Sequence, residues 1–380
     1  MTDAAARALL PAGLRDILPP DAAIEAGAVS KLMGVFESHG YQRVKPPLIE
    51  FEESLLGGGG AAMGPHSFRL MDPVSRRMLA LRPDMTLQIA RIAATRLGHE
   101  PRPLRLGYAG QVLRVAGSQL RPERQFGQAG IELIGSDSAQ ADAEAVRIAA
   151  EGLAALGLTG VSVDLTLPTL VPAVTAALGL ADAKAQAVRD ALDHKDEARL
   201  KGLPGAETFR ALIKAGGAAD AALAKLAAID LPPLAKVELE RLQAVVAAIR
   251  APAPDLELTV DAVENRGFEY HSGVTFTLFA KGASFELGRG GRYRAGDGNG
   301  GPGEPAVGVT LFMDTILRIA PAPPAARRIY LAPGTDPAKA GLLRAEGWVT
   351  VAALDGADPQ DQAKRLGCGH LLINGSIHSL

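Results

Sequence analysis

The sequence predicts an α+β fold in which an antiparallel sheet is flanked by helices, with a helical insertion and a small α/β unit near the C-terminal end. Three observations lead to this prediction. Residues 105–115 mix apolar residues with glycine and arginine, and in residues 125–134 an aromatic residue, polar residues and a glycine alternate with smaller or apolar neighbours. A polar loop joins the two segments, as in a β-hairpin. Residues 168–249 carry alanine, leucine and lysine at helical spacing. Beyond Pro324, strand-like and helix-like segments alternate.

The chain before this hairpin is predicted to hold a helix, a strand, a second hairpin and a second helix. Apolar residues recur at helical spacing from residue 21 until a glycine at position 40 ends the helix. Residues 41–50 are strand-like, and their prolines suit a sheet edge because proline has no amide donor for a central ladder. Residues 68–71 and 78–81 form the hairpin, and residues 87–97 form the helix.

The chain after the first hairpin continues as a helix over residues 139–156 and a strand over residues 161–165. Glycine and proline clusters break the helical insertion that follows. A further hairpin is predicted from residues 263–276 and 284–293. The expected divisions are a core in two parts, the insertion and the C-terminal unit: residues 1–167, 253–322, 168–252 and 325–380.

Composition narrows the classes of function. The chain has 380 residues, of which 47% are hydrophobic, so it can bury a large core. Forty basic residues against 42 acidic ones give a net charge of −2, which does not favour nucleic-acid binding. The single cysteine, Cys368, excludes an internal disulfide or a multi-thiolate metal site, and no apolar run approaches the roughly 18 residues of a membrane span. We therefore expect a cytoplasmic protein with no membrane contact, cofactor or metal.

The second strand of the first hairpin carries a candidate binding surface. Phe126, Gln128, Gly130 and Glu132 share one face because alternate strand residues point the same way. An aromatic ring, an amide and a carboxylate with a glycine between them can hold a small polar ligand. The alternative is a solvent-facing polar row, and the hairpin alone favours that alternative because antiparallel sheets often keep one wet face.

The wider pattern resembles motif 2 of class II aminoacyl-tRNA synthetases in its histidyl-tRNA synthetase form. The resemblance runs from Gly107 through Leu113-Arg114 to residues 124–132. Residues 81–86 are similar to the synthetase segment whose carboxylate and hydroxyl receive the α-ammonium of the substrate, with Asp84 and Thr86 in those places. The alternative for Asp84 is a helix cap. Residues 21–50 resemble motif 1, the dimerisation element.

Two later segments resemble signatures peculiar to histidyl-tRNA synthetases. They are residues 266–271, Arg-Gly-Phe-Glu-Tyr-His, and the Gly-Gly-Arg-Tyr of residues 290–293. The resemblance implies that Arg266 lies at the histidine carboxylate and that Tyr270 and His271 line the imidazole pocket. His271 stands where the family has tyrosine.

The departures from the synthetase pattern concern ATP and tRNA. Arg114 is followed by Val115-Ala116 where motif 2 has a glutamate, and Arg121-Pro122 replaces the Gly-Arg of its loop. Thr315 stands where motif 3 has the arginine that holds the γ-phosphate. The C-terminal unit resembles a shortened anticodon-binding domain. Because phosphoryl chemistry depends on such charges, we expect adenylation and aminoacylation to be lost.

The combination resembles the regulatory subunits of ATP phosphoribosyltransferase. These synthetase paralogues join a short-form catalytic subunit in the first step of L-histidine biosynthesis. The resemblance implies a self-dimer through motif 1, a hetero-octamer with the catalytic subunit, and L-histidine as feedback effector. Its ammonium would lie at Asp84 and Glu132, its carboxylate near Arg266 or Arg114, and its imidazole beside Tyr270 and His271. The expected effector-binding residues are Asp84, Thr86, Arg114, Gln128, Glu132, Arg266, Tyr270 and His271.

Two alternatives remain open at this point. A truncated or atypical histidyl-tRNA synthetase would show ATP–pyrophosphate exchange with histidine. An assembly scaffold with a vestigial pocket would show unchanged thermal stability in excess histidine, because a ligand that binds only the native state must stabilise it.

Overall fold

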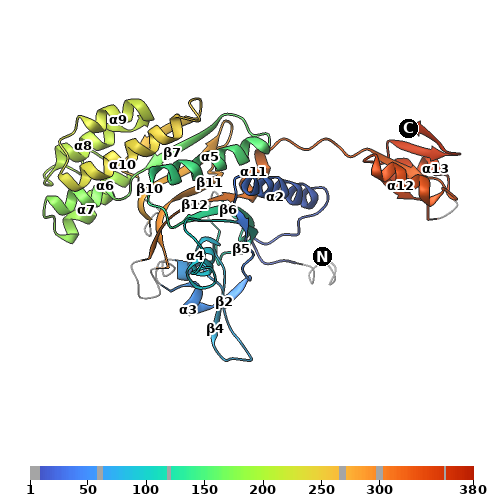
Figure 1. Ribbon diagram of the computed structural model, residues 1–380, viewed down its shortest axis with the longest axis horizontal. Helices are drawn as coiled ribbons and strands as arrows, with labels where there is room; N and C mark the ends of the chain where they lie inside the picture. The colour runs from blue at the N-terminus through green and yellow to red at the C-terminus, as the bar shows by residue number, and fades with distance from the viewer. Residues whose placement is uncertain (1–8, 58–62, 118–120, 265–270, 297–302, 355–356) are drawn as a thin grey trace. The chain divides into compact units, whose positions relative to one another are not determined.

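The computed structural model describes residues 9–57, 63–117, 121–264, 271–296, 303–354 and 357–380. The chain divides into two compact units, Met1–Pro321 and Ala322–Leu380. Each unit has its own sheet and core, and each is treated by itself below. Figure 1 shows the course of the chain.

The described part of the first unit is built on a nine-stranded sheet in the order β1-β5-β6-β12-β11-β10-β7-β9-β8. The central pairs, from β5 across to β7, are antiparallel as predicted. In sheet order the strands are β1 Gln42–Arg43, β5 Leu104–Leu113, β6 Gln125–Ile134, β12 Glu304–Phe312, β11 Gly288–Ala295, β10 His271–Ala280, β7 Val161–Thr166, β9 Glu257–Asp261 and β8 Gly217–Ala218.

The sheet is mixed rather than wholly antiparallel. The pairs β1–β5 and β7–β9, near its two ends, are parallel. Strand direction cannot be read from alternation of side chains, since alternation fixes only the face on which each residue lies. The expectation of an all-helical insertion was also wrong in one detail, because β8 lies within residues 168–252 and pairs with β9.

One face of the sheet is covered by three helices, α2 Asp21–Ser38, α5 Ala139–Ala155 and α11 Met313–Ile319 (Figure 1). The odd-numbered residues Ala129, Ile131 and Leu133 of β6 are buried in the same core as the apolar faces of α2 and α5. The predicted helices over residues 21–39 and 139–156 are therefore confirmed. The even-numbered residues of β6 face the other way.

The opposite face of the sheet is covered by α4 Thr86–Thr95. Beside it lie α3 Glu52–Leu55 and a three-stranded sheet of β2 Ile49–Phe51, β4 Met78–Leu81 and β3 Arg69–Met71, so the predicted hairpin is confirmed. The single strand expected over residues 41–50 is split between β1 and β2. Pro46 and Pro47 lie in the break, where the absence of an amide donor ends the ladder.

A buried ion pair joins the sheet to the start of α5. The guanidinium of Arg292 donates from Nε to Asp142 Oδ1 at 3.0 Å and from Nη2 to Asp142 Oδ2 at 2.6 Å. The same side chain donates to the carbonyl oxygens of Ser136 and Ser138 at 2.8 and 3.0 Å. Arg292 thus points away from α4 and orders the chain at the N-terminal end of α5.

Helices of the insertion gather at the far end of the sheet and share its core (Figure 1). They are α6 Leu170–Ala177, α7 Asp182–Asp193, α8 Ala206–Ala215, α9 Ala219–Ala227 and α10 Pro233–Arg250. Helix α10 packs on α5 and α6, and Arg241 of α10 donates to Asp137 at 2.6 Å. The insertion is therefore continuous with the first unit rather than a separate body.

The second unit has a four-stranded sheet with one helix on each face. Its order is β14 Val349–Ala352, β13 Arg328–Leu331, β15 His370–Ile373 and β16 Ser376–Ser379, with helices α12 Pro337–Ala345 and α13 Pro359–Arg365. The predicted alternation is confirmed. Strand β16 was missed because all four of its residues are exposed, so it carries no apolar pattern.

In the parts of the chain described here, no helix is long and apolar enough to cross a membrane.

Candidate functional site

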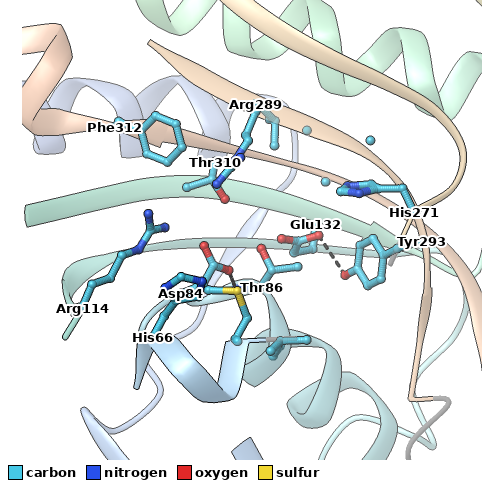
Figure 2. A pocket seen from close by; sticks show the side chains of 16 residues that line it. His66, Asp84, Thr86, Arg114, Glu132, His271, Arg289, Tyr293, Thr310 and Phe312 are labelled. Atoms are coloured by element: carbon cyan, nitrogen blue, oxygen red, sulfur yellow. Dashed lines mark hydrogen bonds between the residues drawn. The ribbon is translucent and has the colours of Figure 1, made fainter. Parts of the chain in front are cut away.

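A cavity of about 420 Å³ opens on the α4 face of the large sheet (Figure 2). Its walls come from the segment before β3, from the start of α4, from Arg114 just after β5, and from β6, β10, β11 and β12. The polar and aromatic residues that line it are His66, Asp84, Thr86, Arg114, Glu132, His271, Arg289, Tyr293, Thr310 and Phe312.

Gly308 lines the cavity, and Gly130 is the sheet partner of the lining residue Thr310. In the sheet register Gly130 lies between Tyr108 and Thr310, and Gly308 lies beside Glu132. A β-carbon on Gly130 would lie 2.5 Å from the Tyr108 hydroxyl, and one on Gly308 would lie 1.8 Å from Glu132 Oε2. Gly130 therefore leaves room for the Tyr108 hydroxyl, and Gly308 leaves room for Glu132. The predicted gap at Gly130 is filled in part by Tyr108.

Gly308→Ala is therefore expected to displace Glu132. Overpacking of this kind costs roughly 1–3 kcal/mol of the free energy of unfolding, measurable by urea denaturation. The matched control is Gly34→Ala on α2, where a β-carbon meets nothing within 4 Å. There the change should be neutral or stabilising by about 0.5–1 kcal/mol, because alanine is the better helix former. Equal stability of the Gly308→Ala and wild-type chains would contradict the packing described here.

Asp84 lies at the entry to α4 with both of its oxygens engaged. Oδ1 accepts from the backbone N–H of Thr86 at 2.9 Å, and Oδ2 accepts from Gln128 Nε2 at 2.9 Å. Gln128 is fully buried, and its Oε1 accepts from the backbone N–H of Met85 at 3.2 Å. The N-cap residue of α4 is Met85, so Asp84 is not the helix cap; it lies one residue earlier and lines the cavity. Gln128 does not line the cavity; it fixes Asp84 from behind.

Glu132 is fully buried and is held by two tyrosines. The Tyr293 hydroxyl donates to Oε2 at 2.9 Å, and the Tyr108 hydroxyl donates to Oε1 at 3.3 Å. Burial raises the pKa of Glu132 to about 8, and the nearby charge of Asp84 contributes to the rise, while the tyrosine hydrogen bonds oppose it. At neutral pH Glu132 is therefore mostly protonated. Burial also raises the pKa of Tyr108 well above its ordinary value, so its hydroxyl keeps its proton.

This raised pKa predicts a pH-dependent stability. Between the ordinary value of 4.5 and about 8, the folded chain holds a proton on Glu132 that the unfolded chain releases. Its contribution to stability is present below this window and is lost as the pH rises through it, by up to about 1.4 kcal/mol per pH unit. Glu132→Gln should remove that fall in urea denaturation over the same window. Glu37→Gln, at an exposed position of α2, should keep the wild-type slope, and an equal slope in Glu132→Gln would contradict the assignment.

Arginines gather at the side of the cavity that also holds Asp84. Arg114 and Arg289 line it, and the Arg114 guanidinium carbon lies 5.1 Å from the centre of the Phe126 ring. Burial lowers the pKa of Arg114, while the charge of Asp84 raises it. Arg121 lies 4.0 Å over Phe312 and forms ion pairs with Asp314 at 3.1 Å and with Glu286 at 3.8 Å. The cavity thus has a cationic side beside a carboxylate.

Most of the predicted site residues come together. Asp84, Thr86, Arg114, Glu132 and His271 line the cavity, with Gln128 directly behind. Arg266 and Tyr270 lie outside the described residues. In the described ranges, His, Cys, Asp and Glu side chains form no group that could hold a metal ion.

Sequence reasoning missed several residues of the site. Tyr293, Arg289, Thr310 and Tyr108 were not predicted. Strand alternation offered a signal for two of them, since Arg289 and Tyr293 fall on the same face of residues 288–295.

Thr315 is buried, and its hydroxyl donates to the Phe312 carbonyl at 3.1 Å, so it brings no charge to the cavity.

Known proteins resemble this chain along most of its length. The histidyl-tRNA synthetase family model matches residues 13–316. A protein of Paramagnetospirillum magneticum named ATP phosphoribosyltransferase regulatory subunit is 60% identical over 375 residues, which cover 98% of each chain. The chain belongs to the family of ATP phosphoribosyltransferase regulatory subunits. Another member, from Rhodospirillum centenum, is 57% identical and covers 98% of this chain, with 96% of its own length aligned.

Comparison with solved structures identifies the fold. A crystal structure from Bacillus halodurans, described as an ATP phosphoribosyltransferase regulatory subunit/histidyl-tRNA synthetase, superposes with a TM-score of 0.81. It is 22% identical and covers 94% of this chain and 96% of its own. At that identity the likeness establishes the fold, and the predicted α+β class with the synthetase-like sheet is confirmed.

Proposed function

We propose that this chain is the regulatory subunit of ATP phosphoribosyltransferase, that it pairs with the short-form catalytic subunit in the cytoplasm, and that it binds L-histidine as a feedback effector. The observation that carries the proposal is a cavity with a carboxylate and cationic groups side by side, in a chain whose 60%-identical relative bears that name. A free amino acid is a zwitterion, so its binding site needs a negative group for the ammonium and a positive group for the carboxylate.

The orientation of histidine follows from the two sides of the cavity. The α-ammonium lies at Asp84, which Gln128 and the Thr86 backbone hold in place. The imidazole extends toward the side with Glu132, Tyr293 and His271 (Figure 2). We favour Asp84 over Glu132 as the ammonium partner, because a mostly protonated Glu132 carries little charge. Arg266 and Tyr270 stay proposed ligands on the resemblance alone.

Regulation would proceed by linkage between the two subunits. If histidine binds one conformation of the hetero-oligomer more tightly, the population shifts toward it and catalysis on the partner falls. Such couplings are typically about 1–3 kcal/mol, which is a change of roughly 5- to 150-fold. The proposed self-dimer uses the motif 1 region, where β1 lies at the edge of the sheet and Leu48 is 41% exposed.

Loss of aminoacylation is the second part of the proposal. Arg114 is followed by Val115 and Ala116, and Thr315 is an uncharged buried residue at the motif 3 position. We expect no ATP–pyrophosphate exchange in the presence of histidine. Exchange at a rate typical of a synthetase would instead support the alternative of an atypical histidyl-tRNA synthetase.

Reconstitution tests the proposal directly. The purified chain is mixed with a short-form catalytic subunit, and phosphoribosyltransferase activity is measured with and without L-histidine. We expect activity to depend on this chain and histidine to lower it. The same assay is run with the Asp84→Asn variant, and the activity of each complex is divided by its own activity without histidine. We expect the complex with the variant to lose its inhibition by histidine. Activity that does not depend on the chain would contradict the proposed partner; undiminished inhibition with Asp84→Asn would contradict the proposed pocket.

A further inference from the structure

We propose that Arg289 is an effector-binding residue and that its guanidinium, together with Arg114, holds the α-carboxylate of the bound amino acid. This inference rests on the proposed function and deepens it, because it names the anion-binding group of the same cavity. Arg289 precedes the Gly-Gly-Arg-Tyr segment and is not part of it.

The register directs Arg289 over the cavity. Arg289 pairs with Thr310 of β12, and Thr310 in turn pairs with Gly130 of β6. Neither neighbour is large enough to fill the space above the sheet, so the long arginine side chain extends over them. Figure 2 shows Arg289 reaching toward Thr310 on the side of the cavity where Arg114 and Asp84 also lie.

The charges around Arg289 leave room for an anion. Arg289 and Arg114 are close enough that the positive charge of Arg289 lowers the pKa of Arg114. Within the described part of the chain, neither guanidinium forms an ion pair with a carboxylate, whereas Arg121 beside them is paired with Asp314. Two like charges held together repel, and a bound carboxylate relieves that repulsion while accepting charge-assisted hydrogen bonds.

The position of Asp84 makes the ligand an amino acid rather than an unspecified anion. Its charge acts on Arg114, so an acceptor for an ammonium lies next to the proposed carboxylate site. These are the two groups that every free α-amino acid carries on one carbon atom. A guanidinium also suits a carboxylate through its two parallel donors, which a lysine ammonium lacks.

A ligand comparison separates this role from a structural one. L-histidine and histamine, which lacks the carboxylate, are titrated into the full-length chain by calorimetry. The variants are Arg289→Gln, Arg289→Lys and the control Arg294→Gln, which changes an exposed arginine of the same strand. We expect the wild-type chain to bind histidine at least about 100-fold more tightly than histamine, because histamine lacks the carboxylate that accepts charge-assisted hydrogen bonds from the two guanidinium groups. Arg289→Gln should shrink that ratio by about tenfold or more, and Arg289→Lys should shrink it less.

The outcomes are distinct. An unchanged ratio of the two affinities in Arg289→Gln overturns the inference and leaves the proposed function intact. Equal losses of affinity for histidine and histamine have the same meaning, because they are expected if Arg289 serves only to pack against Phe312, whose ring centre lies 5.8 Å from its guanidinium carbon. A smaller ratio in Arg294→Gln would also overturn it, because the effect would not be specific to the cavity. If the wild-type chain binds neither ligand, the proposed function fails, and this inference fails with it.

Discussion

Asp84→Asn is expected to lower the affinity for L-histidine by at least about 100-fold, or about 2.8 kcal/mol. The asparagine keeps the size of the side chain and an oxygen for the Thr86 N–H, but it removes the charge that faces the α-ammonium. Its amide also presents a donor where Gln128 Nε2 now donates to Asp84 Oδ2, so the supporting contact is lost or reversed. Calorimetric titration of the variant with L-histidine measures the effect.

The control for Asp84→Asn is Asp190→Asn, an equal change at an exposed position of α7. It should bind histidine as the wild-type chain does. Thermal unfolding of both variants establishes that they fold, and added histidine should raise the midpoint of the control alone. An Asp84→Asn chain that binds histidine within a few-fold of the wild-type affinity would remove Asp84 from the site.

Asp142→Ala is expected to lower the free energy of unfolding by about 3–5 kcal/mol. Asp142 and Arg292 are 1% and 2% exposed, and the substitution leaves the guanidinium buried with only the more exposed carboxylate of Asp137 beside it. The start of α5 keeps the Arg292 hydrogen bonds to the Ser136 and Ser138 carbonyls but loses its buried ion pair with β11. Urea denaturation followed by circular dichroism measures the loss.

The double variant Asp142→Ala, Arg292→Met provides the matched comparison. Replacing both members of a buried ion pair with uncharged residues typically costs much less than removing one of them. The double variant should therefore recover a large part of the stability lost in Asp142→Ala. A single variant that loses less than about 1 kcal/mol would show that Arg292 does not depend on this partner.

Local patterns predicted most of the elements of this fold. Alternation identified β5 and β6, and helical spacing identified α2, α4 and α5. The parallel pairs β1–β5 and β7–β9 were not predicted, because their direction depends on tertiary packing rather than on the pattern of each strand. The very short β8 was missed for a related reason, since Gly217 and Ala218 carry no strand pattern of their own.

The site was predictable where its residues lie on one strand or in one motif. Gln128 and Glu132 share a face of β6, and Asp84 was recognised from its motif at the entry to α4. Thr310 and Arg289 entered the site only through the pairing of β12 with β6 and β11. The pairing of β12 with β6 joins segments more than a hundred residues apart in sequence, and nothing local specifies its register. The buried partner Tyr108 depends on the register of the β5–β6 hairpin, in which Gly130 opposite it leaves space for its hydroxyl.

The measurement that tests the central claim most directly is calorimetric titration of the purified wild-type chain with L-histidine. The cavity places Asp84 beside the two arginines and leaves space for a small ligand, so we predict saturable binding of one histidine per chain. L-Histidinol, which retains the ammonium and the imidazole but lacks the carboxylate, should bind much more weakly. A titration that shows no binding of histidine to the purified chain would contradict the account.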